Sequence, residues 1–344
     1  MPLINELVSP RWLWFTFLLL ASIVVFLAIM LSKCVAALAN KTKLGGAFLG
    51  GFVLSLVTSL PELVSSLTAS LIDNPNLSYN NVYGANALTG TMIAIIDILF
   101  IKKMLFGNIS KQNKQIISIL IIINTLTLIS LLTNNGLVIN LGPLSISGLY
   151  FALFVFYVYF VYVMYNNTEI SEESNKSGLE HLSLKAVVTL FLLVAVSIIV
   201  ISSILTNVVD LMSGEEGYNL GNSLAGALLL SICTALPETV SAFSLAKMGQ
   251  GNMAIGGIVG SHLFNLTILF YGDLFYLENA TFDNLINSSD YQGFMGLVLV
   301  NVVISLFLFV SSNRRVVKNK FIYLLPSVAI VVSYLIGWFM GLIC

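Results

Sequence analysis

The sequence predicts an all-α membrane protein whose ten transmembrane helices form two inverted five-helix repeats. Its composition, its long apolar runs and a duplicated motif support this fold class. Of the 344 residues, 58% are hydrophobic and only 9% are charged, and the mean hydropathy is +0.96. Soluble chains carry about a quarter charged residues. The composition therefore excludes a cytosolic enzyme, a nucleic-acid binder and a disordered chain.

Apolar runs of about 20 residues have the length of transmembrane helices, whereas barrel strands need about 10. The first run follows Arg11. It is longer than the apolar core of a signal peptide and has no cleavage pattern, so we interpret it as a span. We expect spans near residues 12–38, 44–71, 80–101, 115–133, 143–164, 186–212, 219–246, 251–276, 292–311 and 321–343.

One polar segment divides the chain. Residues 166–185 contain four glutamates, two lysines and His181. We therefore expect a first repeat at 1–165, a linker at 166–185 and a second repeat at 186–344. The loops on the linker's side carry every Lys and Arg except Arg11, out of 15 in total. By the positive-inside rule, this side is cytoplasmic and both termini are outside.

A motif occurs twice in the chain. Leu54 to Glu62 reads LSLVTSLPE, and Leu230 to Glu238 reads LSICTALPE. The same offset of 176 residues pairs Gly45 with Gly221, Gly50 with Gly226, Gly84 with Gly260, and Asp97 with Asp273. Five spans separate the copies, so the second copy is inverted in the membrane. Inverted repeats are typical of secondary transporters, whose substrate site lies at the repeat interface.

Four acidic residues fall inside predicted spans: Glu62, Asp97, Glu238 and Asp273. An ionisable group at this depth costs about 2.5 kcal/mol or more, so it indicates a functional site. Hydrogen bonding of the glutamates across helices is the structural alternative. Asp97 and Asp273 could line ion access routes. Equally, they could be helix-end residues paired with water or, for Asp97, with nearby Lys102 or Lys103.

Each glutamate follows a proline, Pro61 or Pro237. Proline lacks an N–H and displaces the carbonyl four residues earlier, here on Val57 and Cys233. It also disturbs the neighbouring carbonyls on Thr58 and Thr234. Carbonyls, a threonine hydroxyl and a carboxylate then share one turn, and the repeat supplies this set twice. Such oxygen ligands suit hard cations such as Ca²⁺, and the absence of His and Cys from the set argues against Zn²⁺ or Cu.

The second part of each repeat reads GANALTG from Gly84 and GSHLFNL from Gly260. Thr89, Ser261 and Asn265 add neutral oxygens there, and interhelical hydrogen bonding is their alternative role. His262 projects about 100° around the helix from Ser261. We interpret it as a packed or hydrogen-bonded histidine, with a proton relay as the alternative. The three cysteines form no metal-binding or disulfide spacing.

The paired motifs resemble the two α-repeats of the Ca²⁺/cation antiporter superfamily, specifically its Na⁺/Ca²⁺ exchanger branch. The resemblance covers about residues 44–101 and 220–276. The H⁺/Ca²⁺ branch fits less well, because it has G-N-A-x-E in place of T-S-x-P-E. The short linker resembles compact prokaryotic-type exchangers that lack the regulatory domain of eukaryotic ones.

The resemblance implies that Glu62 and Glu238 are the central Ca²⁺ carboxylates. It also implies that the other ion ligands are neutral oxygens and that the first and sixth helices slide during alternating access. These further ligands are carbonyls of Thr58 and Thr234, groups of Ser59 and Ser261 at one Na⁺ site, and backbone oxygens of Ser55 and Ser231. The side chains of Thr89 and Asn265 are predicted as ligands from their place in the repeated motif, not from the resemblance.

The sequence departs from the family pattern at three positions. Ala235 and Ala85 replace serines that serve one flanking Na⁺ site in the family, and Thr89 replaces an asparagine. Ser59 and Ser261, on the other flank, are retained. We therefore expect one Na⁺ site to be weakened or lost.

The sequence thus predicts an inner- or plasma-membrane antiporter that exchanges Ca²⁺ for Na⁺. Its predicted partners are these ions and the lipid bilayer, with no cofactor and no obligatory protein partner. An exchanger coupled to H⁺ or selective for another divalent cation is the nearest alternative. A cation channel and a transport-dead membrane sensor are the others. No nucleophile–base set or nucleotide-binding motif suggests an enzyme.

Overall fold

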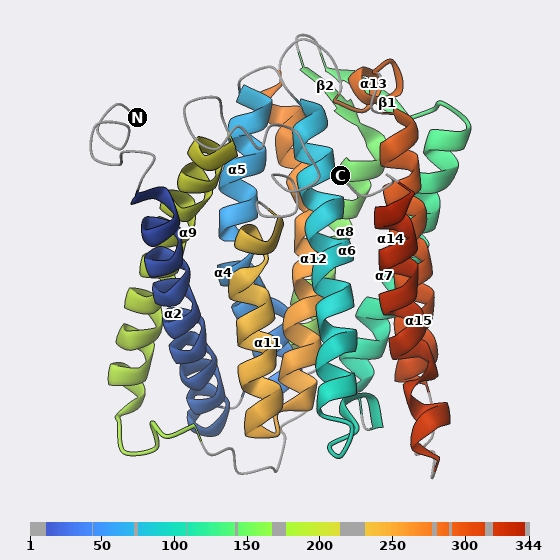
Figure 1. The fold of residues 1–344 in the computed structure, drawn as a ribbon. Coiled ribbons are helices and arrows are strands. Elements are labelled where there is room, and N and C mark those ends of the chain that lie inside the picture. Colours follow the sequence, from blue (N-terminus) through green and yellow to red (C-terminus); the bar gives the residue numbers. More distant parts are fainter. Residues whose placement is uncertain are drawn as a thin grey trace.

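The computed structural model shows long helices that run side by side through the molecule (Figure 1). It describes residues 12–42, 44–71, 75–107, 109–141, 144–166, 177–213, 231–276, 281–288, 291–313 and 319–340. Among these residues, nine helices are long and apolar enough to cross a membrane.

The first half begins with the long helix α2 (Leu13–Lys41). The next span is divided into α3 (Gly46–Phe48), the π-helical turn η2 (Leu49–Leu54), α4 (Ser55–Thr58) and α5 (Leu60–Leu71). Then follow α6 (Pro75–Leu99), the short 3₁₀ turn η3 (Leu105–Gly107), α7 (Lys111–Leu132) and α8 (Gly148–Asn166).

The second half begins with α9 (Leu184–Ser213). After the helical residues 231–234 come α11 (Leu236–Met248), α12 (Gly251–Phe275) and the short α13 (Thr281–Ile286). The chain continues through α14 (Tyr291–Ser312) and α15 (Lys320–Phe339). The first half of the predicted span 219–246, with Gly221 and Gly226, lies outside the described residues.

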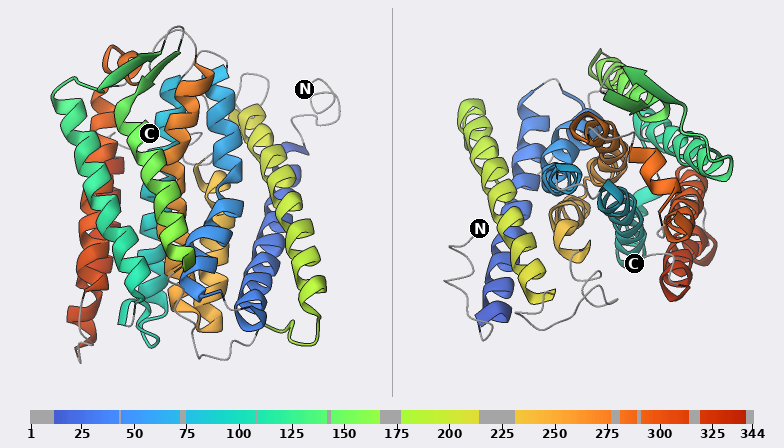
Figure 2. Two further views of the ribbon diagram at one scale, coloured as in Figure 1. Left: turned by 180° about the vertical axis from the view of Figure 1, so that it is seen from behind. Right: turned by 90° about the horizontal axis from the view of Figure 1, so that it is seen from above.

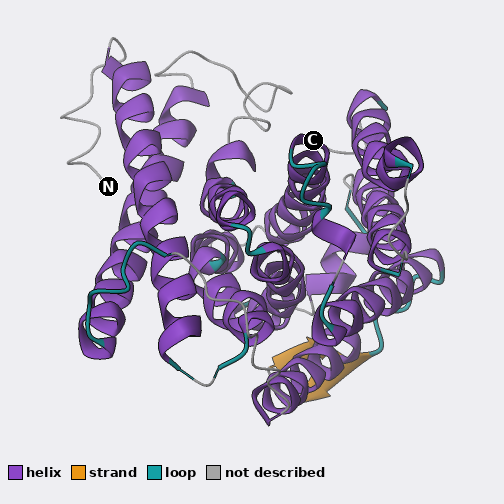
Figure 3. Ribbon diagram, turned by 90° about the horizontal axis from the view of Figure 1, so that it is seen from below, coloured by secondary structure: helices purple, strands orange, loops and turns teal. Residues whose placement is uncertain are grey.

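A β-hairpin that was not predicted from the sequence precedes the helix of the fifth span, α8. Strand β1 (Val138–Leu141) pairs antiparallel with β2 (Leu144–Ser147). The expected start of this span at residue 143 is therefore wrong, because α8 begins only at Gly148. Apolar residues of the hairpin segment run directly into the helix after it, so hydropathy alone joins them. The hairpin lies on the side of the bundle away from α2 and α9 (Figures 2 and 3).

The described basic residues gather at one end of the bundle. Lys41 ends α2, Lys111 begins α7, Lys247 lies in the last turn of α11 and Lys320 begins α15. Figure 1 shows all four helix ends at the lower side, opposite the hairpin. The structure thus places these four lysines on one side of the bundle. This agrees with the expectation that alternate loops, on the linker's side, carry the basic residues.

Helix α12 forms the centre of the molecule. Its most apolar stretch is entirely buried, whereas only 28% of this stretch in α2 and 33% in α9 is buried. Helices α2 and α9 pack against each other at one edge of the bundle (Figure 2). They have 29 and 30 residues, more than the about 20 that span a bilayer. Their large exposed apolar faces suit contact with lipid.

Two glycines allow α12 to touch the backbone of the divided span. A Cβ on Gly260 would lie 2.1 Å from the carbonyl oxygen of Gly51, and one on Gly50 would lie 2.6 Å from that of Met253. Any larger residue would separate the two segments. The contact falls within η2, and π-helical turns frequently occur at functional sites. It sets the register between α12 and the glutamate-bearing span.

Candidate cation-binding site

Both proline-containing spans break at equivalent positions. Ser59 separates α4 from α5 with φ −92° and ψ 4°. Ala235, 176 residues later, precedes α11 with φ −81° and ψ −1°. Each break lies two residues before a proline, where the missing N–H leaves a carbonyl without its helical donor. The structure thus has two half-helix starts, each in the turn where the sequence predicts that a proline displaces a backbone carbonyl.

Glu62 and Glu238 lie in the first turns of α5 and α11. Their exposed fractions are 1% and 4%. The Ser59 hydroxyl donates a hydrogen bond of 3.0 Å to Oε1 of Glu238, which links the two repeats. Among the described residues, both carboxylate oxygens of Glu62 and Oε2 of Glu238 have no hydrogen-bond partner.

Three buried carboxylate oxygens without donors are costly in a protein interior. They argue against the alternative that the glutamates only tie helices together, since Glu62 accepts no such bond. A cation placed among these oxygens would satisfy them. Within the described residues, no three His, Cys, Asp or Glu side chains gather into a metal cluster. Neutral oxygens would therefore complete the coordination.

The two repeats differ by one hydroxyl group beside the glutamates. Ser59 donates to Glu238, and the offset of 176 residues makes Ala235 and Glu62 the equivalent pair. Ala235 is buried but has no hydroxyl. Glu62 therefore lacks the donor that Glu238 has. The sequence predicts the loss of a serine hydroxyl on one flank only. In the structure, Glu238 correspondingly accepts a hydrogen bond that Glu62 lacks among the described residues.

The hydroxyls near the breaks donate to backbone carbonyls of the preceding helical turn. Thr58 donates to Leu54 at 3.1 Å, and Ser55 donates to Gly51 at 2.9 Å. In the second repeat, Thr234 donates to the carbonyl of Ser231 at 3.3 Å. With these protons used, the side-chain oxygens remain available only as acceptors.

Helices α6 and α12 contribute a polar cluster where they pack against each other. Thr89 Oγ1 lies 2.8 Å from Nε2 of His262, and the Asn265 amide donates to Oδ1 of Asn86 at 3.0 Å. The Asn86 amide donates to the His262 carbonyl at 3.1 Å. His262 is thus buried and hydrogen-bonded. The Ser261 hydroxyl donates to the Ile258 carbonyl at 2.8 Å.

Asn86 was not predicted as a site residue, although it lies within the repeated motif. It is the equivalent of His262 at the offset of 176 residues, and it lies three residues before Thr89. The two residue types differ, so an identity search does not pair them. Their equivalence becomes visible only through the contacts.

Asp97 and Asp273 lie near the ends of α6 and α12. Asp97 accepts hydrogen bonds from Tyr323 at 2.6 Å and Ser327 at 2.7 Å. Asp273 accepts from the Ser147 amide at 2.8 Å and from the amide and hydroxyl of Thr281.

Both aspartates therefore tie neighbouring segments to helix ends. Pairing of Asp97 with Lys103 is wrong, because Lys103 donates to the carbonyls of Ala246 and Lys247 at the end of α11.

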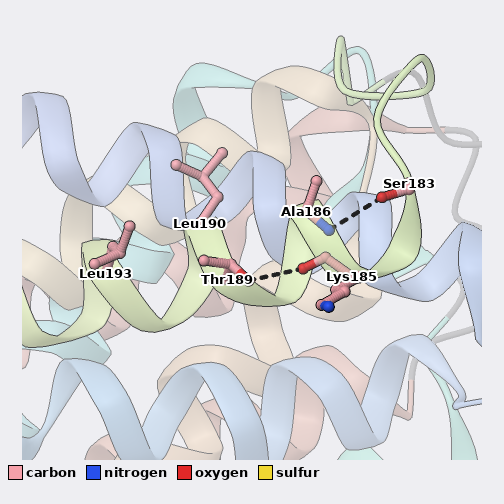
Figure 4. A pocket seen from close by; sticks show the side chains of 6 residues that line it. All are labelled: Ser183, Lys185, Ala186, Thr189, Leu190 and Leu193. Atoms are coloured by element: carbon pink, nitrogen blue, oxygen red, sulfur yellow. Dashed lines mark hydrogen bonds between the residues drawn. The ribbon is translucent and has the colours of Figure 1, made fainter.

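A surface hollow of about 450 Å³ lies elsewhere, on the outer face of α9. Ser183, Lys185, Ala186, Thr189, Leu190 and Leu193 line it (Figure 4). All six residues belong to the start of α9 or its preceding turn. The hollow contains neither glutamate, so it is separate from the candidate cation-binding site.

An inverted-repeat helical bundle with paired carboxylates buried at its centre defines a membrane transporter of cations, not an enzyme. The family comparison gives the same class. The sequence model of the sodium/calcium exchanger protein family matches residues 12–166 and 186–343. The chain belongs to this family.

Several relatives resemble the chain over part or most of its length. The inner membrane protein YrbG of Escherichia coli is 24% identical over 268 residues, which cover 75% of this chain and 77% of YrbG. An uncharacterized membrane protein of Methanocaldococcus jannaschii is 24% identical and covers 66% of this chain. The sodium/calcium exchanger MaX1 of Methanosarcina acetivorans is 36% identical over 62 residues, or 18% of each chain.

Solved structures of the sodium-calcium exchanger NCX_Mj share the fold. One, soaked with 2.5 mM Na⁺ and 0.1 mM Sr²⁺, has a TM-score of 0.66 and 17% identity over 95% of this chain and 98% of its own. Another, soaked with 10 mM Na⁺ and no Ca²⁺, has a TM-score of 0.65 and 15% identity. The match confirms the predicted fold class of ten transmembrane helices in inverted repeats.

Proposed function

We propose that the protein is a secondary antiporter that exchanges Ca²⁺ for Na⁺ around Glu62 and Glu238. One observation supports this most directly. Two buried carboxylates from inverted half-helices lie at the repeat interface, and three of their four oxygens lack a donor among the described residues. Two carboxylates carry the charge that neutralises one Ca²⁺. Na⁺ ions that occupy the same oxygens would exclude Ca²⁺, and this competition couples the two fluxes.

Neutral oxygens would complete the shell of six to eight ligands that Ca²⁺ takes. The proposed set follows the family resemblance and uses both broken spans and both central helices. It comprises Thr58, Thr234, Ser55 and Ser231 near the breaks, Ser59 and Ser261 on one flank, and Thr89 and Asn265 from α6 and α12.

The proposed conformational change moves α2 and α9 across the rest of the bundle. These helices pack mainly on each other and lie at one edge (Figure 2). Of the proposed ligands, none lies on either helix. A sliding pair could therefore expose the site to one side and then to the other without dismantling it. We further propose that the lysine-rich end is cytoplasmic and that both termini are outside. The bilayer and the transported ions would suffice as partners.

Uptake of radioactive Ca²⁺ into proteoliposomes tests the proposal under an outward Na⁺ gradient, an outward H⁺ gradient and no gradient. We expect uptake only with the Na⁺ gradient. Glu62→Gln and Glu238→Gln should each reduce uptake at least about 100-fold, because each removes a charge needed to bind the cation. Both variants should still fold, as judged by size-exclusion elution. Robust uptake in either variant would overturn the central assignment.

An exchanger coupled to H⁺, or selective for another divalent cation, is the second candidate. The alanines at 85 and 235 favour it, because both hydroxyls of one flanking Na⁺ site are absent. Uptake with the H⁺ gradient and not with the Na⁺ gradient would establish H⁺ coupling. Uptake without countertransport would instead indicate a channel. Cation binding without any flux would indicate a sensor.

A further inference from the structure

The contact between α6 and α12 contains two equivalent hydrogen-bonded pairs. Thr89 pairs with His262, and Asn265 pairs with Asn86. Thr89 and Asn265 occupy equivalent positions, 176 residues apart, and so do Asn86 and His262. Each pair therefore joins one repeat to the other at the same place in the pseudo-symmetric fold. All four side chains are at most 3% exposed.

The hydrogen-bond directions leave an acceptor oxygen in each pair. The Thr89 hydroxyl donates its proton to the Ala85 carbonyl at 2.7 Å. It must therefore accept from His262, which fixes the histidine proton on Nε2. The Asn265 amide donates to Asn86. Its own Oδ1 is buried and has no partner among the described residues.

We propose that His262 and Asn86 are positioning residues that hold the oxygens of Thr89 and Asn265 toward the transported cation. The inference rests on the proposed function. Each positioning residue belongs to the repeat opposite the ligand that it orients. Helix α5 packs against α12 and α11 packs against α6, so each glutamate-bearing helix adjoins the helix that carries the opposite repeat's ligand. Outer partners of this kind orient metal ligands, and their loss costs about 10- to 100-fold in metal affinity.

The two pairs are matched in size. The short Thr89 faces the long imidazole, whereas the two amides of Asn265 and Asn86 have equal length. Gly90 provides the room for the imidazole, because a Cβ there would lie 3.1 Å from Cε1 of His262. The equivalent residue in the second repeat is Leu266, and the residue equivalent to His262 is the smaller Asn86. The glycine thus occurs with the larger imidazole, and the leucine occurs with the smaller amide. This pattern indicates that Thr89 and His262 act as one unit.

A double-mutant cycle at Thr89 and His262 tests the inference. In His262→Asn, the shorter amide cannot reach Thr89, so the half-saturating Ca²⁺ concentration should rise about 10-fold or more. Thr89→Asn alone places an amide against the imidazole and should raise it similarly. The double variant recreates the Asn–Asn pair of the other half. It should return to within about threefold of the original value, as coupled residues do.

The readouts are Ca²⁺ uptake by the full-length protein and the Ca²⁺-dependent rise in melting temperature of the purified protein. Asn124→Ala is the matched control. Asn124 donates a buried interhelical hydrogen bond of 3.1 Å to Ser305, between α7 and α14. Its loss should lower the melting temperature and leave the half-saturating Ca²⁺ concentration unchanged.

Four outcomes would overturn the inference. His262→Asn could lower the melting temperature without changing the Ca²⁺ dependence, as the control should. The double variant could remain as impaired as the single variants. Finally, the unmodified protein could show no response to Ca²⁺, Na⁺ or another cation, which would remove the proposed function together with this inference. A cation response that is equal in all variants would remove the inference alone.

Discussion

At the scale of single residues, the difference between Ser59 and Ala235 distinguishes two otherwise equivalent glutamates. Glu238 accepts a hydrogen bond from Ser59, whereas Glu62 accepts none within the described residues. Ala235→Ser would place a hydroxyl beside Glu62. It would thereby restore one oxygen to the flanking Na⁺ site at which Ala85 and Ala235 replace serines. We expect the half-saturating Na⁺ concentration to fall about threefold to tenfold and the Hill coefficient for Na⁺ to rise. Na⁺ titration of Ca²⁺ uptake measures both.

A control variant separates this effect from a general response to a buried hydroxyl. Ala242 is also a buried alanine, and it lies in α11, two turns after Ala235. Ala242→Ser should leave the Na⁺ dependence unchanged. If both serine variants behave alike, or if Ala235→Ser leaves the Na⁺ curve where it was, Ala235 is not the cause of a weakened Na⁺ site.

At the scale of elements, the two prolines couple helix geometry to ion binding. Each lies two residues after a break, and the break presents carbonyls beside a glutamate. Pro61→Ala and Pro237→Ala would each return an N–H to the preceding turn and favour a continuous helix. We expect Ca²⁺ uptake to fall at least about 10-fold while the melting temperature stays equal or rises. Thermal unfolding and uptake of the same preparations test this.

Pro326 supplies the control for the proline substitutions, because it lies inside α15 at the periphery of the bundle. Pro326→Ala should leave Ca²⁺ uptake intact. A fall in melting temperature for Pro61→Ala or Pro237→Ala would instead assign these prolines to folding. Uptake equal to that of the unmodified protein would show that the breaks do not require proline.

At the scale of the whole molecule, the long apolar runs and the internal repeat predict most of the architecture. The predicted first span, 12–38, corresponds to the helix Leu13–Lys41. The predicted ninth span, 292–311, corresponds to the helix Tyr291–Ser312. Hydropathy detects such helices because the bilayer sets their length. The hairpin at Val138–Ser147 was missed, because its apolar residues continue directly into α8. Hydropathy contains no information on where a strand ends and a helix begins.

The candidate site was predicted in its outline but not in its contacts. The repeated proline–glutamate motif identified Glu62 and Glu238, because buried charge is rare enough in a membrane span to be informative. The bond between Ser59 and Glu238 and the Asn86 network join residues more than 170 positions apart. Such contacts depend on how two inverted helices cross, and local sequence patterns do not specify this.

The orientation of the whole bundle in the membrane can be tested by labelling its two ends. If the lysine-rich end is cytoplasmic, the exposed Asn135 near the hairpin faces outward and the exposed His181 before α9 faces the cytoplasm. Asn135→Cys should react with an impermeant maleimide in intact cells, whereas His181→Cys should react only after permeabilisation. Both substitutions would be made in a Cys344→Ser background. Cys34 and Cys233 can remain, because they are buried. The reverse pattern would invert the proposed topology, and labelling of both positions in intact cells would contradict a single orientation.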